Sequence, residues 1–559
     1  MIKFLEFPYE RLDFENISIR MTTHTEKIKG AKTVGEAYLQ IIETDHLEKV
    51  FVSYATLSEA GNTNNSYDEF YLGEEKFFNE AKPKFELLIQ NRNKAILESC
   101  FRSELKKLIG DEFFDSADMQ KRTVSEDVLE LMNAENELSQ EYSTIMSRLT
   151  IDVDGETLTM PQISKLGQSA DRKVRQKYAV LGEKAMLKVA GDLDRIFDEL
   201  MKIRTEIAYK TGFDSYTDYC LCKHGRTSYG REELKAFVTN VEKYIVPVVS
   251  EMIDAQSKRL GHEVKNYDES TLFPGRKVKI EKELLPAFKN IFGRLSPETK
   301  VFFDELCERE FYDLELREGK TMGAYSNYMP LCNMPYIFET YNATEGAVET
   351  FAHECGHGLN SYMHRGEPVT GVSAQSADIC ETHSMSMEFF VWQDIDEIIP
   401  KKDIAAYKYR QLKDSLAFIP YGTAVDLFQT TVYDNPEMTP DERLKLWKDL
   451  EKKFVPWRKY EEGLFYDQGR AWQRQIHVMK WPFYYIDYVL AQVCALQFWA
   501  LDTENHEKAW NAYMSLIKDS GRYSFTEIIK RAGLSTPFED KVLAKIVDTT
   551  LSFIEKLEI

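Results

Sequence analysis

The sequence predicts a mainly α-helical protein that carries a small β-sheet and is built from at least two lobes. Long stretches have the apolar spacing of helices, whereas residues 311–341 alternate in the manner of strands. The chain has 559 residues, and single hydrophobic cores stop growing beyond about 250–300 residues. We therefore expect an N-terminal helical lobe over residues 1–200 and a second, larger region over residues 201–559.

Helices are expected over most of the chain, with interruptions where glycine, proline and asparagine gather. Residues 27–150 have successive helical stretches with breaks at 61–65 and at Lys82-Pro83. The Asp154-Gly155 pair is typical of the turn of a β-hairpin, here over residues 149–158. Further helices are expected at 171–211, 231–260 and 296–310 and again after residue 400, where loops are expected near 420–422, 434–436 and 462–463.

The small sheet is expected from three short segments, at residues 312–314, 324–328 and 336–340. An edge strand of such a sheet can pair with an extended peptide. A purely structural hairpin explains the same pattern equally well, so both alternatives stay open.

The pentapeptide His353-Glu354-Cys355-Gly356-His357 predicts a zinc site. Residues 348–363 contain no proline and favour a helix, on which His353 and His357 lie one turn apart on the same face. Two imidazoles at that spacing can bind one Zn²⁺. Glu354 points about 100° away from His353 and is therefore placed to act as general base on a water at the open side of the metal. The alternative is two histidines that fall at this spacing by chance.

A catalytic zinc needs a third protein ligand. The three-histidine pattern is disfavoured, because Met363 stands where the third histidine belongs and His364 follows one residue too late. A carboxylate from a later helix is the other solution. Our choice is Glu381, which completes a site for one zinc per chain.

The segment around Glu381 forms an acidic helix face. Asp378, Glu381 and Glu388 share this face, and residues 366–400 contain no lysine or arginine that would neutralise it. Such a face repels itself unless a cation lies against it. We expect Asp378 and Glu388, with Glu349 as a further candidate, to accept the second ring N–H of the histidines. A face that only contacts solvent, and an exposed Glu349, are the alternatives.

Taken together, these motifs resemble the thimet-oligopeptidase and oligoendopeptidase-F family of zinc metallopeptidases. That family pairs an H-E-x-G-H helix with a helix that bears E-x-x-S-x-x-x-E, and Glu381 and Glu388 match the two acids. Residues 319–325 are similar to its G-K-x-x-G-A-Y segment, and His477 with residues 482–488 resembles the P-F-Y-x-x-x-Y region of the oligoendopeptidase-F branch. The matching segments follow the family's order.

The resemblance implies a zincin fold of the gluzincin type, in which two mainly helical lobes surround a deep substrate channel that the C-terminal helices close. It also implies that the substrates are short, unfolded peptides. A row of aromatic residues on a helix is more often core than catalytic, so the roles of the tyrosines rest on the resemblance. The implied site residues are the hydrogen-bond donors to the charged intermediate, His477, Tyr484 and Tyr488, and the substrate-binding residues Gly323, Ala324 and Tyr325.

Composition limits the partners and the location of the protein. The net charge of −21 argues against a nucleic-acid surface, since phosphates attract lysine and arginine. The longest apolar stretch, residues 489–501, is too short to span a bilayer, and residues 1–8 lack the apolar core of a signal peptide. Eight cysteines, two of which (Cys355 and Cys380) lie on the expected metal-site helices, suit a reducing compartment. We therefore expect a cytoplasmic protein with no membrane or nucleic-acid partner.

The leading hypothesis is a zinc endopeptidase that hydrolyses internal bonds of short oligopeptides. An exopeptidase of the carboxydipeptidase or aminopeptidase kind has the same metal site when its cleft is closed at one end. A catalytically silent peptide-binding protein with a structural zinc is an alternative from another class, although such a site has no need of Glu354. The oligomeric state, the cleavage preference and the metal used in the cell stay open.

Overall fold

The computed structural model describes residues 2–274, 278–369 and 375–558. The protein is mainly α-helical with small sheets, so the predicted fold class is confirmed. No helix in the described part of the chain is both long enough and apolar enough to cross a membrane.

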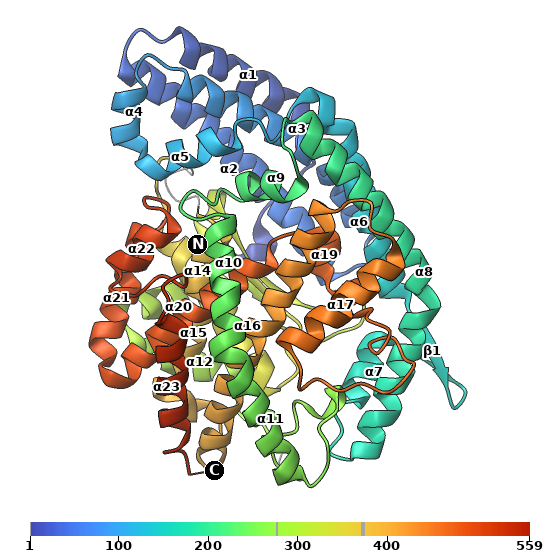
Figure 1. Cartoon of the computed structure of the whole chain (residues 1–559). Helices are drawn as coiled ribbons and strands as arrows, with labels where there is room; N and C mark the ends of the chain where they lie inside the picture. The colour runs from blue at the N-terminus through green and yellow to red at the C-terminus, as the bar shows by residue number, and fades with distance from the viewer. Residues whose placement is uncertain (1, 275–277, 370–374, 559) are drawn as a thin grey trace.

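The first helices lie at one end of the molecule (Figure 1). They are α1 (Phe14–Gly30), α2 (Val34–Asn64), α3 (Glu69–Leu97), α4 (Arg102–Ile109) and α5 (Asp111–Gln120). Asp13, Thr33 and Asp68 begin the first three helices, because their side chains accept a backbone N–H of the first turn. The predicted break at Lys82-Pro83 is wrong. Helix α3 continues through a buried Pro83, since packing against α1 and α2 outweighs the roughly 3 kcal/mol that an interior proline costs.

A hairpin and a long helix follow. The elements are α6 (Leu129–Arg148), β1 (Thr150–Val153), β2 (Glu156–Thr159), α7 (Met160–Leu166) and α8 (Arg172–Lys210). Asp154 and Gly155 have φ of 54° and 93°, as the predicted two-residue turn requires. Helix α8 runs along one side of the molecule and passes residue 200 without interruption (Figure 1). No loop therefore marks the expected lobe boundary, and a division at that residue stays a prediction.

The middle of the chain leads to the sheet that precedes the metal-site helices. Its helices are α9 (Tyr216–Lys223), α10 (Arg231–Asn240), the π-helical turn η3 (Val241–Ile245), α11 (Val246–Leu260), α12 (Leu284–Leu295) and α13 (Pro297–Glu308). The strands are β3 (Tyr312–Asp313), β4 (Ala324–Met329) and β5 (Met334–Glu339), in the spatial order β3-β5-β4. Strand β4 pairs antiparallel with β5, with Ala324 opposite Glu339. Strand β4 is therefore an edge strand, as expected for this region.

The chain after the sheet is helical again. It contains α14 (Glu345–Met363), α15 (Ala377–Phe390), α16 (Ile404–Asp434), α17 (Pro440–Phe454), α18 (Ala471–Arg474), α19 (Ile476–Lys480), α20 (Tyr485–Glu504), α21 (His506–Asp519), α22 (Phe525–Arg531) and α23 (Val542–Ile554). The loop predicted near residues 420–422 is wrong, because α16 runs through a buried Pro420. As at Pro83, packing of the flanking residues overrides the local signal.

Two hydrophobic clusters hold the helices that carry the predicted site residues. The larger one joins the three-stranded sheet with α14, α15 and α20. The second joins α8 with the segment that precedes α20: the rings of Phe197 and Trp472 lie 4.7 Å apart. Residues from the first 200 positions and from the last third of the chain therefore share one core.

Candidate functional site

Helix α14 presents two histidines to α15. Thr344 caps the helix by accepting the N–H of Ala347, and the rings of His353 and His357 lie 4.9 Å apart on the same face. Gly356 lets α15 approach closely, because a Cβ at this position would lie 2.7 Å from the Cα of Ser384. The glycine of the pentapeptide thus brings the second helix within reach of both imidazoles.

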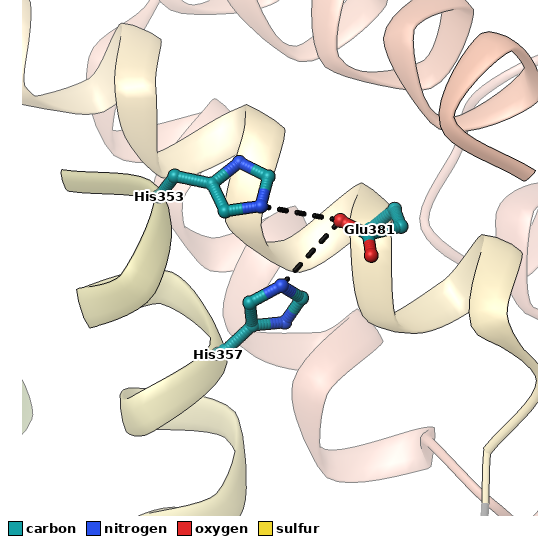
Figure 2. Close-up of side chains that lie close together, drawn as sticks. All are labelled: His353, His357 and Glu381. Atoms are coloured by element: carbon teal, nitrogen blue, oxygen red, sulfur yellow. Dashed lines mark ion pairs between the residues drawn. The ribbon is translucent and has the colours of Figure 1, made fainter. Parts of the chain in front are cut away.

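The carboxylate of Glu381 on α15 faces both imidazoles (Figure 2). Its Oε2 lies 3.2 Å from Nε2 of His353 and 3.4 Å from Nε2 of His357. Two ligand atoms that are each about 2.1 Å from a tetrahedral zinc lie about 3.4 Å apart. The spacing and the donor set of two imidazoles and one carboxylate therefore fit a zinc ion, and these three residues form a group that can hold a metal.

The electrostatics of the site favour a charged carboxylate at Glu381. Its burial alone would raise its pKa, but the charges and hydrogen bonds of His357 and His353 lower the pKa below the ordinary value. Burial would likewise lower the pKa of His353, whereas its hydrogen bonds to Glu381 and Glu388 raise that pKa.

Glu354 is a buried carboxylate with an unpaired oxygen. The residue is 6% exposed, and its Oε2 has no hydrogen-bond partner among the described residues. Burial raises the pKa of Glu354, while the charges of His353 and His357 lower it. An unsatisfied buried carboxylate oxygen is costly, which is explained if a water or a substrate group occupies this position.

The three expected supporting acids differ in what they contact. Glu388 accepts a hydrogen bond of 2.8 Å from Nδ1 of His353, which leaves Nε2 for a metal. Glu349 forms an ion pair with Arg410 and does not bond a histidine. Asp378 also requires a correction: its carboxylate accepts the hydroxyl of Tyr229 at 2.8 Å and the hydroxyl of Ser376. Asp378 lies in the first turn of α15, where its side-chain partners are these hydroxyl groups and not the imidazoles.

His477, Tyr484 and Tyr488 meet beside Glu381, as the resemblance implies. The ring of His477 lies 6.1 Å from that of Tyr484 and 5.6 Å from that of Tyr488. The two tyrosines have different partners. The hydroxyl of Tyr484 donates to Oε1 of Glu381 at 2.8 Å, so it orients that carboxylate. No hydrogen bond to a described residue engages the hydroxyl of Tyr488, whose pKa is raised by burial and by the charge of Glu381.

Gln475 contacts His477, and the sequence did not predict it as a site residue. Its Nε2 donates to Nδ1 of His477 at 2.9 Å, and its Oε1 accepts the hydroxyl of Tyr421 at 3.1 Å. With the amide of Gln475 in this orientation, the proton of His477 resides on Nε2. Burial lowers the pKa of His477 to about 4, so the ring is neutral near pH 7. Gln475 lies two residues before His477 and belongs to no motif. Its contact with Tyr421 is long-range, so the local sequence could not identify it.

The expected substrate-binding segment forms the start of the edge strand. Gly323 has φ of 132°. Its carbonyl accepts the N–H of Thr340 at 3.0 Å, and its N–H donates to Oγ1 of Thr340 at 3.1 Å. The side chain of Tyr325 turns away to bond Thr63 of α2 at 2.7 Å and to stack on Phe338 at 4.9 Å. Only backbone groups of Ala324 and Tyr325 are thus offered at the edge.

Family models and solved structures agree on the relationships of the chain. Residues 4–124 match the Peptidase M3 N-terminal domain, and residues 298–548 match Peptidase family M3. No curated protein matches significantly.

Three solved structures resemble the whole chain. PZ peptidase A, solved with an inhibitor, is 34% identical with a TM-score of 0.96, and the match covers 100% of both chains. A protein assigned as an oligoendopeptidase F is 32% identical with a TM-score of 0.96, over 100% of this chain and 99% of the other. A third, assigned likewise, from Bacillus anthracis str. Ames, is 31% identical with a TM-score of 0.91 over the same shares. The chain therefore belongs to peptidase family M3 and is a metalloendopeptidase of its oligoendopeptidase-F branch.

Proposed function

We propose that the protein is a zinc-dependent endopeptidase that hydrolyses internal bonds of short, unfolded oligopeptides, with one zinc held by His353, His357 and Glu381. The observation that carries the proposal is that Nε2 of His353 and Nε2 of His357 lie 3.2 and 3.4 Å from Oε2 of Glu381, next to the buried Glu354 with its unpaired Oε2. A structural zinc would close its fourth position and would need no base.

The residues divide the reaction between them. A bound zinc supplies Lewis-acid chemistry that polarises water and the peptide carbonyl. Glu354 takes a proton from the attacking water and passes it to the departing amine nitrogen. Its unpaired Oε2 and raised pKa suit both steps, because a carboxylate of higher pKa is the stronger base.

The negative charge that develops on the carbonyl oxygen requires donors on the opposite side. Tyr488 fits this role because its hydroxyl stays protonated and has no partner among the described side chains. His477 supports it as a neutral ring with its proton on Nε2. Tyr484 instead keeps Glu381 oriented. The proposed roles thus separate two tyrosines that share one helix face.

Access to the site supports peptides as substrates. The side chains of His353 and His357 are 18% and 21% exposed, and that of Glu381 is 3% exposed. An extended chain that pairs with the edge of β4 can reach such an enclosed centre, whereas the surface of a folded protein cannot. We further propose a cytoplasmic location without nucleic-acid or membrane partners, which the net charge of −21 and eight free cysteines support.

The experiment is mass-spectrometric mapping of cleavage in a peptide of about ten residues that is blocked at both ends. We expect internal cleavage that stops when a chelator removes the metal and returns when zinc is added. Casein and a folded protein serve as comparisons and should be cut far more slowly. Cleavage only of peptides with a free end would identify an exopeptidase and would contradict the proposal, as would unchanged activity of the chelated protein.

A further inference from the structure

Phe483, directly before Tyr484, has a strained backbone. Its φ is 65°, a left-handed conformation that is a genuine outlier for a bulky side chain. The residue is 2% exposed and lies between α19, which carries His477, and α20, which carries Tyr488. Such strain persists only where the surrounding structure holds the backbone in place.

Two buried side chains from distant parts of the chain hold this residue. The N–H of Phe483 donates to Oε1 of Gln429 at 2.9 Å, and its carbonyl accepts from Nη2 of Arg226 at 2.5 Å. Gln429 is fully buried on α16, and Arg226, in the loop after α9, is 2% exposed. Both backbone groups of the strained residue are therefore fixed from outside its own segment.

Arg226 and Tyr229 together link α15 and α20, the helices that carry the site. The same Nη2 donates to Asp487 of α20 at 3.0 Å, one residue before Tyr488. The hydroxyl of Tyr229 donates to Asp378 of α15 at 2.8 Å, and the same oxygen lies 3.3 Å from the carboxylate of Asp487. Asp378 lies one turn before Glu381. A continuous buried network thus runs from the helix of the third ligand to the helix of the proposed donor.

We propose that Arg226 and Gln429 are positioning residues, which hold Phe483 in its left-handed conformation and thereby set the place of Tyr488 relative to Glu354. This inference rests on the proposed peptidase function. Arginine is favoured at position 226 because its planar guanidinium holds its N–H groups in fixed directions, whereas the ammonium of a lysine ends a flexible chain with no fixed donor geometry. A role in folding alone would leave turnover unchanged in variants that still fold.

The test compares Arg226→Lys and Gln429→Leu with Arg443→Lys. Arg443 of α17 is a matched control. It is 1% exposed, and it bonds the carboxylate of Asp198 and the backbone carbonyl of Met438. We expect a fall in kcat of about 10- to 100-fold for the first two variants, since a misplacement near 1 Å costs that much. KM and zinc content should change less than about threefold. Arg443→Lys should keep wild-type kcat even if its melting temperature falls.

Two further measurements distinguish positioning from structural support. In the metal-free proteins, hydrogen exchange over residues 478–488 should rise in Arg226→Lys and Gln429→Leu but not in Arg443→Lys. The double variant Arg226→Lys/Tyr488→Phe should be no slower than Tyr488→Phe within about twofold, because the arginine acts through that tyrosine.

Three outcomes would overturn the inference: wild-type kcat in Gln429→Leu, loss of zinc from Arg226→Lys, or multiplicative effects in the double variant. If Arg226→Lys does not fold, Gln429→Leu decides by its kcat and its hydrogen exchange. A wild-type protein without zinc-dependent cleavage would instead refute the proposed function. Active wild-type enzyme with unaffected variants would refute the positioning role alone.

Discussion

The two halves of the site are built in different ways. The metal half consists of two regular helices, α14 and α15. His353 and His357 lie one turn apart on α14, and Glu381 faces them from α15, which approaches closely at Gly356. The donor half, residues 477–488, consists of a short helix, a strained Phe483 and the start of α20. It is held by side chains from positions as distant as Arg226 and Gln429. Local spacing encodes the first half, and long-range contacts encode the second.

The halves meet at Glu381. Its Oε2 faces the two histidines, while its Oε1 accepts the hydroxyl of Tyr484. A change on one side can therefore be separated from a change on the other by measuring zinc content and turnover together. In the metal half, substitutions of the ligands and of the residues that support them should alter zinc binding, whereas substitution of the proposed base Glu354 should not. Substitutions in the donor half should alter kcat with zinc retained.

The largest effect is expected for Glu354→Gln. This variant removes the proposed base without removing a ligand, so kcat should fall by about 10³-fold or more while zinc content stays at one per chain. Activity and metal analysis on the same preparation check both parts. Substantial turnover with zinc bound would remove Glu354 from the mechanism.

The second-largest effect is expected for Tyr488→Phe, which tests the donor half. Loss of one hydrogen bond to the developing charge should lower kcat by about 10²-fold, with KM and zinc content little changed. Tyr485→Phe is the control, because its ring lies on the same helix and packs against Phe418 and Tyr421. Equal kcat values for the two variants would show that Tyr488 has no special role.

Glu388→Gln returns to the metal half. Glu388 accepts from Nδ1 of His353, and loss of a charged partner of a ligating histidine lowers metal affinity by about 10- to 100-fold. Titration with a competing chelator would measure this change. The zinc-saturated variant should keep most of its kcat, and a large loss there would show that Glu388 acts in the reaction as well.

The sequence could predict the metal half because its signals are local. Helical spacing and an acidic face led to His353, His357 and Glu381, and the structure places both imidazoles within 3.4 Å of Oε2 of Glu381. Elsewhere in the chain, the local pair Asp154-Gly155 marked the hairpin of β1 and β2. Local signals failed where packing decided, at Pro83 and Pro420.

Tertiary contacts also hid several partners. The helix face that suggested Asp378 as a partner of a histidine could not show the hydroxyl of Tyr229, which lies 149 residues away. Gln475, Arg226 and Gln429 carry no motif, since their partners in the donor half are defined only when distant segments fold together. Motif spacing therefore identifies ligands better than it identifies the residues that position donors.

The smallest effect, and the most direct test of local encoding, is expected for Gly356→Ala. The added Cβ would lie 2.7 Å from Cα of Ser384 and 2.9 Å from the carbonyl oxygen of His383, and backbone atoms cannot move aside as side chains do. Overpacking of this kind costs roughly 1–3 kcal/mol, of which the better helix propensity of alanine offsets about 1 kcal/mol. The variant should lose about 1 kcal/mol of unfolding free energy and bind zinc less tightly. Gly346→Ala on the same helix meets nothing within 4 Å and should gain stability, so equal effects of the two substitutions in denaturant titrations would contradict a tuned contact between α14 and α15.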